Sequence, residues 1–149
     1  MFPKISGKPL QLKCSEHAFP EFPDLLFGDT DDSISYFDAT AYIQTKGLDI
    51  NIIDIFKHYE YPIKALMSSY GVSDEEICKI NQEGHYLIDG NLVYLFISFV
   101  EPEFFAYIYD RIHEMFSDGF CLSDTYIAKL AKCRLSESVL EKIIENGEN

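Results

Sequence analysis

The histidines and cysteines of this chain are the side chains that could do acid–base, nucleophilic or metal chemistry. They are His17, His58, His85 and His113, and Cys14, Cys78, Cys121 and Cys133. Their positions match neither the H-E-x-x-H nor the C-x-x-C spacing that brings metal ligands together, and no P-loop, G-x-S-x-G or G-x-G-x-x-G motif is present. A thiol of Cys78 or Cys121 could still meet a distant histidine in the fold, although a buried, unreactive cysteine is the commoner situation. We therefore expect no enzyme, no metal and no cofactor.

Acidic side chains form a second group with a chemistry of its own. Residues 73–120 hold ten acids and two bases. Carboxylates aligned on one face would imitate a phosphate array and occupy the basic groove of a nucleic-acid-binding protein, whereas scattered ones would only keep the surface soluble. The candidates for such a partner-binding face are Asp74, Glu75, Glu76, Glu83, Glu101, Glu103 and Asp110.

Composition limits the class of protein. The 149 residues carry a formal charge of −13, which repels nucleic acid and anionic membranes at long range. An apolar content of 47% with 15% aromatic residues suits one folded unit. Widely spaced cysteines, the absence of a signal-peptide pattern and the short apolar run at 92–100 favour a soluble protein with reduced thiols in the cytoplasm or nucleus.

Apolar spacing and turn residues predict the elements that would position these side chains. The first half is expected to contain strands at 10–14 and 34–36 and helices at 39–46, 50–59 and 62–70. Asp38 and Asp49 are the expected N-caps of the first two helices, and Gly47 ends the first.

The second half is predicted to be mostly helical. We expect a short helix at 73–80 opened by a Ser73–Glu76 capping box, a strand at 85–88, a buried helix at 92–100, a helix from Pro102 to 117–119, and helices at 123–132 and 136–145. The helix after Pro102 is amphipathic, with apolar residues on one side. The last two helices are expected to form a docking or dimerising hairpin.

Four short blocks occur in an informative order. They are Tyr36-Phe-Asp-Ala-Thr40, Phe56-Lys57, Gly84-His-Tyr86 and Phe99-Val-Glu-Pro-Glu-Phe104. In order and spacing they resemble the KilA-N domain, a relative of the fungal APSES DNA-binding fold. Family members usually carry asparagine where Asp38 stands, tryptophan at the positions of Phe56 and Phe99, and often lysine at that of Ala41.

The resemblance implies a fold and a function. It implies an α+β fold with a winged-helix-type core, and a regulatory protein of the kind found in phages and large DNA viruses. By this resemblance the DNA-facing helices fall within residues 36–72, where Lys46, Lys57, His58 and Lys64 would meet phosphates. Four such groups are fewer than the roughly six to ten phosphate contacts of a typical specific site, so we expect weak binding to double-stranded DNA.

Taken together, the sequence predicts an α+β protein with an N-terminal arm at 1–33, a KilA-N-like domain at 34–120 and a C-terminal helical extension at 121–149, all in one compact unit. Its expected function is that of a non-enzymatic, DNA-associated regulator. The alternative is an acidic inhibitor that has lost DNA binding and targets a host nucleic-acid-binding protein. A homodimer is compatible with both.

Overall fold

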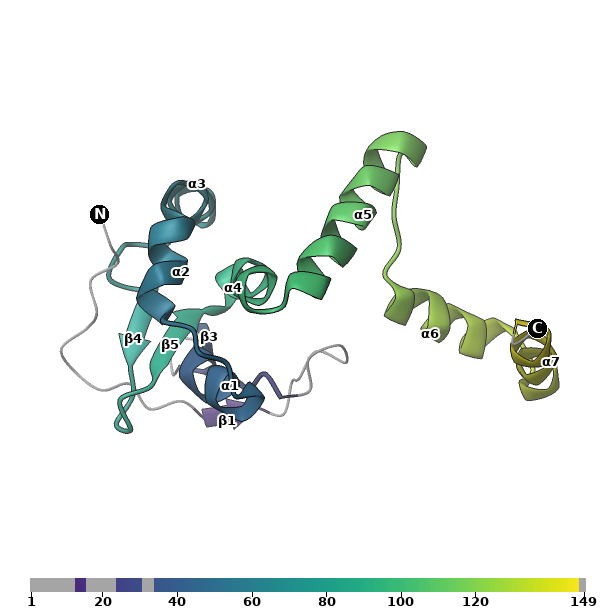
Figure 1. The fold of residues 1–149 in the computed structure, drawn as a ribbon, viewed down its shortest axis with the longest axis horizontal. Coiled ribbons are helices and arrows are strands. Elements are labelled where there is room, and N and C mark those ends of the chain that lie inside the picture. Colours follow the sequence, from purple (N-terminus) through teal and green to yellow (C-terminus); the bar gives the residue numbers. More distant parts are fainter. Residues whose placement is uncertain (1–12, 16–23, 31–33, 148–149) are drawn as a thin grey trace. The chain divides into compact units, whose positions relative to one another are not determined.

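Seven α-helices and a five-stranded antiparallel sheet make up the described part of the chain, which confirms the predicted α+β class (Figure 1). The computed structural model describes residues 13–15, 24–30 and 34–147, the first of these ranges as backbone only. The chain divides into two units, residues 1–105 and 106–149, here called the N-terminal and C-terminal units. This division differs from the expected single unit and from the predicted boundary at 120/121.

Short strands pair throughout in antiparallel fashion, in the order β1-β2-β3-β5-β4. They are β1 (Lys13–Ser15), β2 (Phe27–Asp29), β3 (Ser35–Asp38), β4 (Cys78–Ile80) and β5 (Tyr86–Asp89). Central strand β3 places Phe37 opposite Phe27 on one side and Ile88 on the other. The strands predicted at 34–36 and 85–88 are confirmed to within two residues. Most of the strand predicted at 10–14 lies outside the described residues, and β2 and β4 were not predicted.

The step from β3 into the first helix follows the prediction. Oδ1 of Asp38 accepts a hydrogen bond from the N–H of Ala41 (2.8 Å) and so caps α1 (Ala39–Lys46). The helix ends where Gly47 adopts a φ of 63°, a left-handed conformation that costs glycine little.

The second helix begins later than predicted. Asn51, and not Asp49, caps α2 (Ile52–His58), because its Oδ1 accepts the N–H of Ile53 (3.0 Å). The chain stays irregular before this cap, where Leu48 and Ile50 pack against the core. Next comes α3 (Glu60–Tyr70), which confirms the helix predicted over 62–70.

The helix predicted at 73–80 is wrong. Only one of the two capping-box bonds forms: Oε2 of Glu76 accepts the N–H of Ser73 (3.2 Å). The Oγ of Ser73 donates to the same Oε2 (3.0 Å), and the N–H of Glu76 donates to the carbonyl of Ser73 (3.0 Å). They close a turn that leads into β4 instead of a helix. Cys78 is fully buried and pairs with Ile88 of β5, so tertiary pairing overrides the local signal.

A tight hairpin joins β4 to β5. Oδ1 of Asn81 accepts the N–H groups of Glu83 and His85 (2.9 Å each), and Gly84 takes a φ of 82° that side chains disfavour. After β5, the carboxylate of Asp89 caps the 3-10 helix η1 (Gly90–Leu92), which runs into α4 (Val93–Val100). The buried helix predicted at 92–100 is confirmed.

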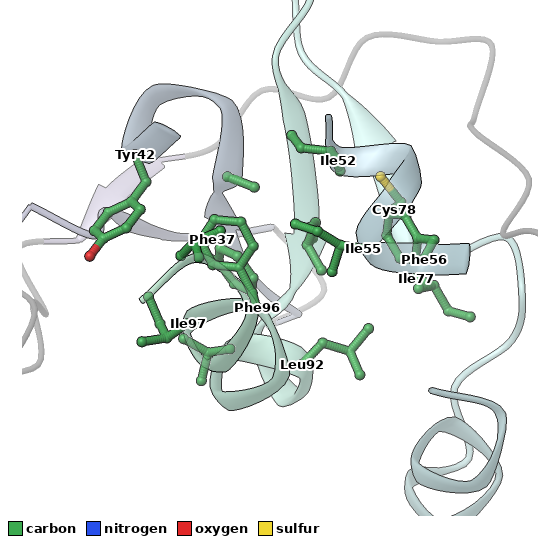
Figure 2. Close-up of a cluster of buried hydrophobic side chains, with 14 of the residues drawn as sticks. Phe37, Tyr42, Ile52, Ile55, Phe56, Ile77, Cys78, Leu92, Phe96 and Ile97 are labelled. Atoms are coloured by element: carbon green, nitrogen blue, oxygen red, sulfur yellow. The ribbon is translucent and has the colours of Figure 1, made fainter. Parts of the chain in front are cut away.

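The core of the N-terminal unit lies between the sheet and helices α1, α2 and α4. Phe96 of α4 packs against Phe37 of β3 and Tyr42 of α1, with ring centroids 5.1 and 5.8 Å apart. Figure 2 shows the rings of Phe37 and Phe96 against each other. The same cluster includes side chains of α2 and of the segment that enters β4, namely Ile52, Ile55, Phe56, Ile77 and Cys78.

Three helices complete the chain, α5 (Pro102–Asp118), α6 (Asp124–Arg134) and α7 (Glu137–Gly147), and all three were predicted. In the first turn of α5, Phe104 packs against the core of the N-terminal unit. From residue 106 to 147 no residue is buried. The change within one continuous helix explains why the chain divides near residue 105 and not at a loop. It also means that the apolar side of α5 is left largely exposed.

Candidate binding surfaces

Lys46, one of the predicted phosphate-binding residues, is held by groups of its own unit. Its ammonium lies 3.2 Å from Oδ2 of Asp24, and both side chains are partly exposed. The ammonium also lies over the ring of Tyr42, 5.6 Å from its centroid. Lys46 is therefore neutralised by a carboxylate and placed by an aromatic face.

Lys57 and Lys64 flank the junction between α2 and α3, and each has an acidic neighbour on its own helix. Nζ of Lys57 is 3.9 Å from Oδ1 of Asp54, and Nζ of Lys64 donates to Oε1 of Glu60 at 2.8 Å. The bond from Lys64 lowers the pKa of the Glu60 carboxyl. This carboxylate therefore stays charged, and keeps cancelling its lysine, over the whole physiological pH range.

His58 is the fourth residue of the predicted set, and it is engaged in aromatic packing. Its ring meets the rings of Tyr59 and Phe99 edge-on, with centroids 4.7 and 5.4 Å away. Tyr59 and Phe99 pack in turn against the core. Phe99, from the last of the four blocks that resemble the KilA-N domain, thus packs against the two residues that follow the Phe56-Lys57 block, and it does so through aromatic contact.

Together these contacts leave little positive surface at the predicted DNA-facing helices. Three of the four bases have a carboxylate within 4 Å, and the N-terminal unit as a whole carries 17 acids and 7 bases, a formal charge of −10. An exposed ion pair is worth only about 0–1 kcal/mol, so phosphate could displace each carboxylate. The displaced carboxylate would nevertheless stay nearby and repel the same phosphate.

The predicted acidic face is spread over several elements. Asp74 and Glu75 are exposed in the turn before β4, whereas Glu76 of the same turn is bonded to Ser73. Glu83 lies at the hairpin tip, at the opposite end of β4. Glu101 accepts the hydroxyl hydrogen of Tyr42 (2.5 Å), Glu103 lies in the first turn of α5, and Asp110 belongs to the C-terminal unit. The seven carboxylates therefore belong to several elements and to both units.

A cluster that sequence reasoning missed joins two of the resemblance blocks. Nδ1 of His85 lies 2.8 Å from Oδ2 of Asp38, with both side chains less than a fifth exposed. Beside this pair, the N–H of Tyr86 donates to Oγ1 of Thr40 (2.9 Å). We call these four residues the junction cluster. Asp38 was predicted as a cap, but no local signal indicated that its second oxygen would reach the hairpin, 47 residues away.

The junction cluster has the geometry of a structural clamp. Asp38 uses one oxygen for the α1 cap and the other for His85, while the second acidic neighbour of His85, Glu83, is 3.8 Å away. Among the described residues, no hydroxyl or thiol bonded to this imidazole is seen that could act as a nucleophile. The cluster therefore ties α1 to the hairpin.

Burial raises the pKa of several ionisable side chains of the N-terminal unit. Burial raises the pKa of the Cys78 thiol to about 12, so its reactive thiolate is scarce. Burial likewise raises the pKa of the Tyr36 hydroxyl to about 12, and it also raises the pKa of the Asp89 carboxyl. The hydroxyl of Tyr36 donates to the carbonyl of Glu76 (2.9 Å), which fixes the turn before β4 to the sheet.

Metal ligands and membrane-spanning helices are two further kinds of site that a fold can carry. Over the described residues, no group of three or more histidine, cysteine or acidic side chains is arranged to hold a metal ion. Within the same residues no single helix is long and apolar enough to cross a bilayer, although the bent pair 90–100 and 102–118 reaches that length and composition together.

Comparison of the chain with protein-family models, with curated proteins and with solved structures finds no match.

Proposed function

We propose that this chain is a non-enzymatic binding protein with a KilA-N-like core, and that its partner is a protein with a basic surface and not DNA. The KilA-N-like assignment is supported by the way the resemblance blocks meet in one unit. The first and third blocks are clamped through Asp38 and His85, and Phe99 packs with His58 beside the second. The shared nucleus fits the arrangement that the resemblance implies.

One observation carries the choice of partner. Each lysine of the implied DNA-facing surface is matched by a carboxylate of the same unit, in a unit whose formal charge is −10. Long-range repulsion slows the approach of a polyanion and favours that of a polycation. The exposed carboxylates of Asp74 and Glu75 are adjacent in one turn, and we propose that they contact the basic surface of the partner.

Fluorescence anisotropy with two labelled probes tests the proposal. The probes are a mixed-sequence DNA duplex and a lysine-rich peptide of similar length, each titrated with the full chain at about 20 mM and about 150 mM salt, where screening differs. We expect the peptide to bind and the duplex to stay free at both salt concentrations. Asp74→Lys/Glu75→Lys should weaken peptide binding at least tenfold.

A matched control separates a local site from general charge. Asp29→Lys/Asp49→Lys changes the charge of the same unit by the same amount at two other exposed positions. An equal loss in this control would show that the peptide senses only net charge and would overturn the assignment to the acidic turn.

DNA-associated regulation remains the second candidate, favoured by the placement of Lys57, His58 and Lys64 around one helix junction. Duplex binding at low salt that Lys57→Glu weakens at least tenfold would establish it and reject our first proposal. Peptide binding should be unchanged in that variant.

A further inference from the structure

The C-terminal unit presents large apolar side chains that its described residues leave more than a third exposed. Twelve large apolar residues between 106 and 147 are more than a third exposed. They are Tyr109, Ile112, Met115, Phe116, Phe120, Leu122, Tyr126, Ile127, Leu135, Val139, Ile143 and Ile144. Monomeric proteins rarely leave so much apolar surface in water without a use for it.

Helix length points to the same need. Both α6 and α7 have 11 residues, and isolated helices shorter than about 12–15 residues are marginal in water. The contacts between α5 and α6 include the bond from the N–H of Asp124 to the hydroxyl of Tyr107 (3.1 Å) and the pair of Nη1 of Arg111 with Oδ1 of Asp124 (3.7 Å), whose carboxylate is largely exposed. The helices therefore depend on packing that the described residues of one copy do not supply.

The exposed area is large enough for a stable interface. A fully buried aromatic side chain covers roughly 150–250 Å², and an aliphatic one somewhat less. With about half of each side chain exposed, the twelve residues together offer an apolar surface on the order of 1,000 Å². A standard interface takes about 800 Å² from each partner. Six of the twelve residues lie on or between α6 and α7, so these two helices supply about half of the exposed area from each copy, and the rest comes from α5 and the segment before α6.

Charge indicates which partner fits. Helix α6 carries three bases and one acid, whereas α7 carries three acids and one base. Lys129 and Lys132, three residues apart, lie on one side of α6. Glu137, Glu141 and Glu145, spaced by four, lie along one side of α7 next to its apolar residues. Two copies of this surface can therefore pair, because the basic helix of each copy can lie against the acidic helix of the other.

We propose that the C-terminal unit is a homodimerisation module in which α6 of one copy packs against α7 of the other. The apolar faces meet, and the lysines of α6 face the glutamates of its partner's α7. A two-fold arrangement forms this contact twice, which is what a closed symmetric dimer requires. The inference concerns residues 106–147 and does not depend on the partner of the N-terminal unit.

Analytical ultracentrifugation of the full chain tests the dimer. We expect a monomer–dimer equilibrium, and Ile143→Asp should raise the dimer dissociation constant at least tenfold. Circular dichroism and urea unfolding of each variant report whether the N-terminal unit, whose core contains no residue after 105, stays folded. A native chain that stays monomeric at about 100 µM, far above typical weak dissociation constants, would overturn the proposal and assign the apolar faces to a different protein.

Charge reversal distinguishes pairing between copies from pairing within one copy. Lys129→Glu/Lys132→Glu makes α6 and α7 both acidic, and Glu137→Lys/Glu141→Lys makes both basic, so each variant alone should lose the dimer. Mixed in equal amounts, the two should recover dimers by forming a heterodimer, because each helix again meets one of opposite charge. Each chain keeps its own like-charged helices in the mixture, so recovery cannot arise within one copy. Failure of the mixture to recover dimers would overturn the α6–α7 pairing.

Discussion

Asp38 offers the sharpest test of how the N-terminal unit is held together. Its two carboxylate oxygens perform different tasks, one capping α1 through the N–H of Ala41 and the other binding His85 on the hairpin, both at 2.8 Å. The substitution Asp38→Ala removes both bonds, whereas Asp38→Asn keeps an oxygen for the cap and loses the charged partner of the imidazole. The two variants therefore separate the two contributions.

The magnitudes follow from the two bonds. Loss of an N-cap typically costs about 1 kcal/mol, and loss of a hydrogen bond to a charged group about 1.5–3 kcal/mol. Because the side chains are less than a fifth exposed, solvent replaces these bonds poorly. We expect Asp38→Ala to lower the free energy of unfolding by about 3 kcal/mol and Asp38→Asn by about 1.5 kcal/mol. For a unit of this size, about 3 kcal/mol lowers the melting temperature by roughly 12 °C or more.

Urea unfolding followed by circular dichroism, in a double-mutant cycle with His85→Ala, measures the coupling directly. We expect a coupling free energy of at least about 1 kcal/mol between the two side chains. Asp54→Ala serves as the control, because its pair with Lys57 is exposed and long at 3.9 Å and should contribute less than about 0.5 kcal/mol. If Asp38→Ala and Asp38→Asn destabilise equally and the coupling is zero, the clamp between α1 and the hairpin does not exist.

Three further predictions follow from the core and its ionisable groups. Phe96→Ala removes a ring that is 1% exposed and packs on Phe37 and Tyr42. The free energy of unfolding, measured with urea, should therefore fall by about 3–5 kcal/mol, and a loss below about 1 kcal/mol would contradict the packing. Burial raises the pKa of Asp89, so the folded state holds this proton more tightly than the unfolded state, and its contribution to stability is lost as pH rises above about 4 through the folded pKa. Asp89→Asn should therefore gain stability relative to the parent between pH 4 and 7 in unfolding titrations, and a parallel pH dependence of the two proteins would refute this. Maleimide should label the exposed Cys133 of the native protein quickly and the buried Cys78 only after unfolding. Peptide mass mapping identifies the labelled cysteine, and rapid labelling of Cys78 in the native protein would contradict its burial and its pKa of about 12.

Local signals were enough to predict most helices. Asp38 and Gly47 cap the two ends of α1, and an apolar run forms α4. Both signals lie within or next to the helix that they predict, so local spacing is enough to place these helices. The same reasoning failed at 73–80, where Ser73 and Glu76 bond to each other but close a turn, and the chain continues into β4. That outcome depends on pairing with β5, which no window of local sequence contains.

The candidate site was harder to predict than the fold. Lys46, Lys57 and Lys64 were correctly placed on helices, but their carboxylate partners decide their use. The partner of Lys46 is Asp24, 22 positions earlier, which only the folded chain reveals. Spacings of three and four along the helix would have indicated the partners of Lys57 and Lys64 in advance. The contact from Asp38 to the hairpin is a product of sheet topology.

Strand β4 has a consequence for the behaviour of this chain at high concentration. It stands at the end of the strand order, contributes only three residues and has Lys79 at its centre. A short edge strand with a positive charge is a poor template for pairing with a strand of another molecule, and natural sheets resist fibrillar aggregation in this way. Concentrated solutions of this protein should therefore accumulate helical assemblies and remain free of amyloid-type material.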